Sequence, residues 1–114
     1  MKYLFTMSPN VKAILAVMVE RIVNGFKPER IILFGSNARG AAGTDSDVDL
    51  IIVMPTIESK RKIRLAIREA VSGMGLSKDI LVYTPEEMEN YRSLTGSLVR
   101  SAWREGKVLY ERVA

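Results

Sequence analysis

Aspartate occurs only four times in this chain, and the four residues cluster at two places. Asp45, Asp47 and Asp49 precede or enter an apolar run, and Asp79 begins a later one. On an extended strand, residues two apart point to the same face, so the carboxylates of Asp47 and Asp49 would lie side by side. Such a pair repels unless a cation or a proton lies between the two groups. The spacing predicts a Mg²⁺ or Mn²⁺ site that Asp79 would complete if its strand lies beside the second one. A turn followed by an ordinary strand start explains the same residues.

A second candidate for chemistry is Gly35-Ser36, which follows an apolar run. A strand, a glycine and a helix start can aim backbone N–H groups and a hydroxyl at an anion. Gly35 would let a ligand approach the backbone, and Ser36 would donate to a phosphate oxygen. The alternative is a tight turn with Ser36 as a helix N-cap. Arg39 has two interpretations, since its charge could stabilise a triphosphate or form an ion pair with Asp45 or Asp47.

The chain contains no cysteine and no histidine. Disulfides, thiolate nucleophiles, Cys/His zinc sites and a Ser-His-Asp triad are therefore excluded. Phosphoryl transfer needs alignment and charge neutralisation more than covalent help from the protein. A chain with carboxylates, a hydroxyl and arginines can still catalyse that chemistry.

Length and composition indicate one ordinary globular domain over residues 1–114. The chain is 47% hydrophobic and 26% charged, with a net charge of +4 and a pI near 9.6. A modest positive charge is compatible with nucleotides or RNA as partners. The apolar run Ala13–Val19 is far shorter than the ~20 residues that span a bilayer, and no signal peptide is evident. We expect a cytoplasmic protein without a membrane partner.

Helical and strand patterns alternate along the chain. Ser8-Pro9 is typical of a helix start, and Gly25 is the predicted stop of that helix. Thr84-Pro85-Glu86-Glu87 predicts a capping box. The remaining predicted elements are strands at 30–34, 48–53, 79–83 and 108–110, and helices at 58–72 and 97–105. The pattern predicts the α/β class (α+β in some schemes), with a small sheet covered by helices.

The predicted helix at 58–72 has two stripes. Ile63, Ala66, Ile67, Ala70 and Val71 form its apolar face, and Arg61, Arg64 and Arg68 lie beside it. The arginines form either a solvated face or a docking site for RNA or an acidic partner. Met18, Met74 and Trp103 are expected in the core.

The segment Gly35-Ser36-Asn37-Ala38-Arg39-Gly40, five further residues, and Ser46-Asp47-Val48-Asp49-Leu50 form a compound pattern. With Phe34 included (residues 34–50), it closely resembles the signature of the nucleotidyltransferase fold, the superfamily of DNA polymerase beta and kanamycin nucleotidyltransferase. Asp79 matches the family's third carboxylate. The run from Gly106 to Glu111 resembles the end of the minimal nucleotidyltransferases, so the resemblance covers residues 30–111.

The resemblance implies a small mixed β-sheet flanked by helices, with the site at one edge. Gly35, Ser36 and Arg39 would bind the nucleotide, and Asp47, Asp49 and Asp79 would be the metal-binding and catalytic residues. It also implies a magnesium or manganese cofactor, in the form of two ions, with ATP as the donor. Asp79 would in addition help to deprotonate the acceptor hydroxyl.

Larger relatives carry a second domain that binds the acceptor, and 114 residues leave no room for one. The resemblance therefore implies that a partner macromolecule presents the hydroxyl. Minimal nucleotidyltransferases pair with HEPN-domain proteins in a hetero-oligomer, often as antitoxin to an RNase toxin, and can adenylylate that partner on tyrosine. The alternative is an antitoxin that neutralises its partner by contact alone. An RNA-binding module has the weakest support, resting on the arginines and the pI.

Overall fold

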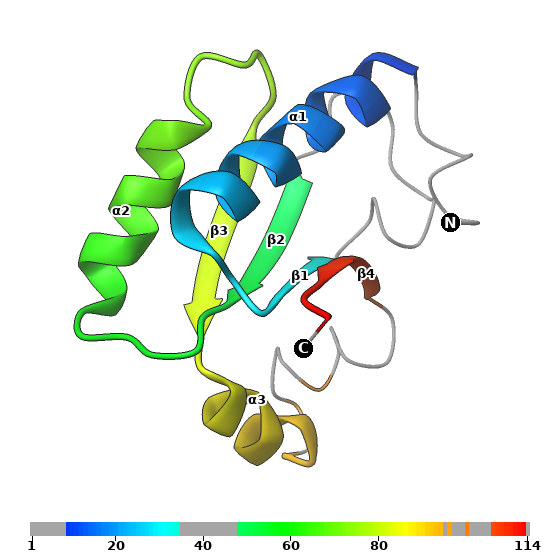
Figure 1. The fold of residues 1–114 in the computed structure, drawn as a ribbon. Helices are drawn as coiled ribbons and strands as arrows, with labels where there is room; N and C mark the ends of the chain where they lie inside the picture. The colour runs from blue at the N-terminus through cyan, green and yellow to red at the C-terminus, as the bar shows by residue number, and fades with distance from the viewer. Residues whose placement is uncertain (1–8, 35–47, 95, 97–99, 101–105, 114) are drawn as a thin grey trace.

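One four-stranded mixed sheet organises the molecule (Figure 1). The computed structural model describes residues 9–34, 48–94, 96, 100 and 106–113. Their elements, in chain order, are α1 (Pro9–Phe26), β1 (Arg30–Phe34), β2 (Val48–Val53), α2 (Lys60–Ala70), β3 (Lys78–Tyr83), α3 (Pro85–Arg92) and β4 (Lys107–Glu111). The strand order is β3-β2-β1-β4, in which β1 is antiparallel to β2 and β4, whereas β2 and β3 are parallel. The predicted class of a small mixed sheet with helices is confirmed.

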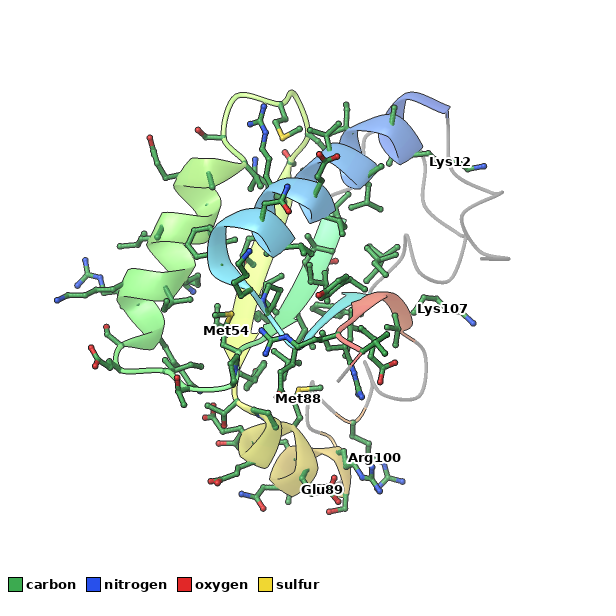
Figure 2. All side chains as sticks on the ribbon, in the orientation of Figure 1. Lys12, Met54, Met88, Glu89, Arg100 and Lys107 are labelled. Atoms are coloured by element: carbon green, nitrogen blue, oxygen red, sulfur yellow. The ribbon has the colours of Figure 1, made fainter. Side chains whose placement is uncertain are left out.

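The two faces of the sheet bury different sets of side chains. α1 and α2 cover one face, where Met18 and Ile22 of α1 and Ile67 of α2 are fully buried against alternate residues of β1, β2 and β3. On the other face Met88 of α3 packs in a smaller cluster of buried residues, Ile32, Phe34, Ile51 and Val53. Met88 lies between α3 and the strands in Figure 2. Because β2 is buried on both faces, it is the centre of the core.

α1 does not end where the sequence predicts. Pro9 opens the helix as expected, but the helix passes Gly25 and ends at Phe26. Lys27 takes the left-handed conformation, with φ at 55°, and its N–H donates to the carbonyl of Val23 at 3.1 Å. Pro28 follows and has no N–H with which to extend the helix. α1 is 18 residues long, and no helix of the described segments is long and apolar enough to cross a membrane.

α2 is shorter than predicted and its apolar stripe is narrower. Ser59 is the N-cap, and its side chain accepts from the N–H of Lys62 at 3.3 Å. Ile67 and Val71 are fully buried and Ile63 packs against the same cluster, as expected. Ala66 is exposed, so its assignment to the core face was wrong.

The strands follow the prediction closely. β1 and β2 have the predicted bounds, β3 begins one residue earlier, at Lys78, and β4 is one residue longer at each end. Met18 is buried and Met74 packs at the margin of the core, whereas Trp103 lies outside the described residues. The predicted helix at 97–105 also lies outside them, apart from Arg100.

The predicted capping box of α3 is confirmed, and it carries an additional ion pair. The hydroxyl of Thr84 accepts from the N–H of Glu87 at 3.2 Å, and the carboxylate of Glu87 accepts from the N–H of Thr84 at 3.0 Å. Lys60, from the start of α2, donates to the same carboxylate and lies 4.9 Å from the centroid of the Tyr83 ring. The edge of the Tyr91 ring completes this group, with centroids 6.1 Å apart. The starts of α2 and α3 are thereby joined at the end of β3.

This arrangement predicts an acid-sensitive contribution to stability. Burial acts to raise the pKa of Glu87, but the hydrogen bonds from Lys60 and Thr84 outweigh it and hold the pKa below the ordinary value of 4.5. The pKa of Glu87 is therefore lower in the folded chain than in the unfolded chain. Its contribution to the free energy of unfolding is complete at a pH above the unfolded-state pKa, and it is lost as the pH falls through the folded-state pKa. Glu87→Gln keeps a capping side chain but removes the charge.

We expect Glu87→Gln to lower the free energy of unfolding by about 0.5 kcal/mol at neutral pH, the scale of a partly exposed ion pair. The difference from the wild type should disappear as the pH is lowered below 4.5. Urea unfolding of both proteins across this pH range measures it. A difference that persists unchanged at low pH would show that the charge of Glu87 contributes nothing.

Candidate active site

Three strand ends meet in one row of the sheet, and this row contains two of the four aspartates. Asp49 of β2 is paired with Phe34 of β1 on one side and with Asp79 of β3 on the other. Phe34 immediately precedes Gly35-Ser36 in the sequence. The row therefore brings together the start of β2, the start of β3 and the end of β1.

The carboxylates of Asp49 and Asp79 project from the same face of the sheet. Residues paired across parallel strands share a face, and neighbouring strands lie about 4.8 Å apart. This is the face of Phe34 and Ile51, opposite to the face covered by α1 and α2. Asp49 is half-buried and Asp79 is exposed; within the described residues the side chain of Asp79 has no hydrogen bond or ion pair. Two adjacent carboxylates concentrate negative charge at this end of the sheet.

The crossover through α2 makes these two aspartates neighbours. Parallel strands cannot be joined by a tight hairpin, so the chain leaves β2, forms α2 on one face and returns in the same direction as β3. The N–H of Val48 donates to the carbonyl of Ser77 at 2.9 Å, which aligns the starts of the two strands. Buried Ile67 and Ile80 hold the helix and the strand together. The core thus fixes the register that pairs Asp49 with Asp79.

Two lysines occur at the same end of the sheet but on its other face. Lys78 precedes Asp79, so alternation places it on the α1 and α2 face, where its ammonium donates to the carbonyl of Leu76 at 3.3 Å. Lys107 is paired with Leu33, which also faces α1. Its side chain points away from the sheet in Figure 2. Neither lysine belongs to the face that carries the carboxylates.

Phe34 belongs to the signature at residues 34–50, but no role in the site was predicted for it. It is 8% exposed and packs with Ile51 and Met88 on the carboxylate face. The available signal was the position of Phe34 as the last strand residue before Gly35.

The other predicted site residues, Gly35, Ser36, Arg39, Asp45 and Asp47, lie outside the described residues. Among those described, no group of three or more acidic side chains could hold a metal ion. Asp49 and Asp79 are two members of the predicted set of three, and their oxygens are the hard ligands that Mg²⁺ and Mn²⁺ prefer. The donor set therefore fits such an ion.

The fold described above is that of the nucleotidyltransferases. The family model for the nucleotidyltransferase domain matches residues 17–109, most of the chain, and the chain is a member of that family. It is an enzyme of the nucleotidyltransferase class. A protein of Methanocaldococcus jannaschii, named as a putative protein adenylyltransferase, is 40% identical over 75 residues, which cover 57% of this chain and 76% of that protein.

Solved structures share the fold at low sequence identity. A crystal structure described as a putative nucleotidyltransferase from Sulfolobus solfataricus has a TM-score of 0.65 at 20% identity and covers 90% of this chain and 84% of its own. A second, described as a toxin-antitoxin with AMP-PNP, has a TM-score of 0.55 at 18% identity and covers 84% of this chain and 73% of its own. Both confirm the arrangement of the sheet and helices.

Proposed function

We propose that this chain transfers AMP from ATP to a hydroxyl group of a partner macromolecule, in a reaction that depends on Mg²⁺ or Mn²⁺. The observation that carries the proposal is the pairing of Asp49 with Asp79 on one face, in the row that also contains Phe34. The 40% identity to a protein named as an adenylyltransferase supports AMP as the transferred group.

Each residue of the signature has a role in this proposal. Asp49 and Asp79, together with Asp47, would hold the metal, which supplies positive charge to the triphosphate when it is bound. Gly35 would allow the phosphates to approach the backbone, and Ser36 would donate to a phosphate oxygen. Arg39 would add positive charge to the same group.

The transfer is a single displacement at phosphorus. The acceptor oxygen forms a bond to the α-phosphorus, the bond from that phosphorus to the bridging oxygen breaks, and pyrophosphate leaves. The proton of the acceptor hydroxyl passes to the carboxylate of Asp79. No covalent enzyme intermediate is needed, in keeping with a chain that lacks cysteine and histidine.

The proposed acceptor is a tyrosine hydroxyl of a HEPN-domain protein, with this chain as the antitoxin of the pair. The fold likeness to a structure described as a toxin-antitoxin with AMP-PNP is in keeping with such an assembly. The second candidate function is neutralisation of the partner by contact alone, without transfer.

Intact-mass spectrometry separates the two functions. The test uses the HEPN-domain protein encoded beside this chain, whose presence the proposal itself predicts. With ATP and Mg²⁺, the partner should gain about 329 Da for each AMP attached through its hydroxyl. Asp79→Asn should still bind the partner but leave its mass unchanged, because that side chain serves the site.

The outcomes of this experiment are exclusive. An added mass with the wild type that is absent with Asp79→Asn supports transfer. A partner that is bound and neutralised equally by both proteins, with no added mass, would establish the contact-only function instead.

A further inference from the structure

The positive charge of this chain is concentrated on one helix. α2 contains five basic residues and one acidic residue, a net charge of +4 that equals the net charge of the entire chain. Lys60 is paired with Glu87, whereas Arg61, Lys62, Arg64 and Arg68 form no ion pair with any described residue. All four are exposed. Like charges at this spacing weaken a helix, so the core-facing side of α2 must compensate for them.

Three of these cations lie on one flank of α2. Arg61, Arg64, Leu65 and Arg68 are spaced at i, i+3, i+4 and i+7, which places them in a single stripe along the helix. We call these four residues the arginine stripe. Its apolar member, Leu65, is 47% exposed. At 100° per residue, Lys62 lies about 160° around the helix from Arg64, on the solvent-exposed side away from buried Ile67.

The arginine stripe borders an open edge of the sheet. β3 is an outermost strand, and none of the described strands pairs with its outer side. The carbonyls of Ser77 and Tyr83 accept from Val48 and Met54, so these odd-numbered residues direct their main-chain groups toward β2. By alternation, the N–H and C=O groups of Ile80 and Val82 point to the outer side. An unpaired edge of this kind is a template for another strand.

Two open grooves lie between α2 and β3. The helix and the strand run side by side in Figure 1 and contact each other. Two arginines of the stripe line the first groove and one lines the second, in each case beside apolar side chains. The first is lined by Lys60, Arg61, Arg64, Leu81, Val82 and Tyr83. The second is lined by Leu65, Arg68, Ser72, Leu76, Ser77 and Lys78, together with one acidic residue, Glu69.

We propose that the arginine stripe and the outer edge of β3 form a docking surface for an extended acidic segment of another protein. The segment would add a strand beside β3, with acidic side chains at every second position facing the arginines. Its main chain would pair with Ile80 and Val82, and Leu65 would pack against the methylene groups of the acidic side chains. This surface does not depend on nucleotide transfer, because Asp79 projects from the other face of the sheet.

Charge and hydrogen-bonding chemistry favour an acidic protein segment over a second copy of this chain and over single-stranded RNA. A second copy of this chain, docked through the same edge, would bring two helices of net charge +4 together, which opposes association. Single-stranded RNA could use the arginines, but it would leave the edge N–H groups and Leu65 without partners. A protein strand with acidic side chains would use the arginines, the main-chain groups at the edge of β3 and Leu65 together.

Fluorescence anisotropy with a synthetic probe tests the proposal. The probe is a rhodamine-labelled peptide in which Glu and Val alternate, long enough to cover β3. Arg64→Glu should weaken binding about tenfold, whereas the matched control Lys62→Glu, with the same charge reversal on the other flank, should change it less than about twofold. Arg64→Glu should fold well, because a glutamate four residues before Arg68 favours the helix.

Two further measurements test strand addition itself. The same peptide with every backbone N–H methylated retains its charges but cannot donate, and we expect it to bind at least about fivefold more weakly. Hydrogen exchange at the amides of Ile80 and Val82 should slow when the unmodified peptide is bound.

Three results would overturn the docking surface. An equal loss of peptide affinity with Arg64→Glu and with Lys62→Glu would show that binding depends only on the overall charge of the chain. Tighter binding of a single-stranded RNA of equal charge, without protection of Ile80 and Val82, would assign the stripe to RNA. Absence of binding by the peptide would remove the surface altogether.

Discussion

Asp49→Asn should abolish nucleotidyl transfer and leave the fold intact. The substitution keeps the size of the side chain and removes one charge from the pair that Asp49 forms with Asp79. Loss of a carboxylate from the proposed metal site should lower the rate by about a thousandfold or more. Without metal the two carboxylates repel, so the melting temperature should stay the same or rise slightly. Release of pyrophosphate from ATP measures the rate, and Asp79→Asn should behave in the same way.

Glu20→Gln is the matched control for this experiment. Glu20 is exposed on α1, on the other face of the sheet, and its loss removes the same charge. This variant should transfer at the wild-type rate. Mg²⁺ should raise the melting temperature of the wild type and of Glu20→Gln, but not that of Asp49→Asn. If Asp49→Asn transfers AMP as fast as the wild type with Mg²⁺ present, the assignment of the site is wrong.

Ile52→Ala should produce a large loss of stability. Ile52 is fully buried in β2, under the helices that cover one face of the sheet. Removing three buried carbons leaves a cavity that the surrounding strands cannot close, at a cost of about 3 kcal/mol. That is a large part of the ~5–15 kcal/mol by which ordinary domains are stable. The midpoint of urea unfolding measures the change.

Val17→Ala provides the comparison. Val17 is 42% exposed on α1, and alanine favours a helix, so the free energy of unfolding should change by less than about 0.5 kcal/mol. Equal stability of Ile52→Ala and Val17→Ala would contradict the position of β2 at the centre of the core.

Local sequence patterns were sufficient for most of the elements. β1 and β2 have the predicted bounds because each is a short apolar run between turn residues, and Thr84 and Glu87 cap α3 as their spacing predicts. The predicted end of α1 was wrong because packing against the core outweighed the stop signal of Gly25. Phe26 contacts the core, so one further residue beyond Gly25 is held in the helix.

The sequence singles out the residues of the candidate site, but it does not show how Asp49 and Asp79 come together. A period of two identifies the face of Asp49 from sequence alone, but only the crossover places Asp79 beside it. Nothing in the local sequence pairs Lys60 with Glu87 either, because they belong to different helices and meet only at the end of β3. The tertiary fold decides both contacts.

The position of β1 between β2 and β4 has a consequence for how the chain is made. Arg30 pairs with Glu111, and these residues are 81 positions apart. During synthesis β1 can pair early with β2, but its other side stays open until residues 107–111 have been translated. The apolar strand Ile31-Ile32-Leu33 therefore presents an unpaired edge to other nascent chains for most of that time. β4 is the last strand to pair with this edge and thereby protects it from aggregation. A chain truncated before residue 107 would leave that edge of β1 permanently unpaired.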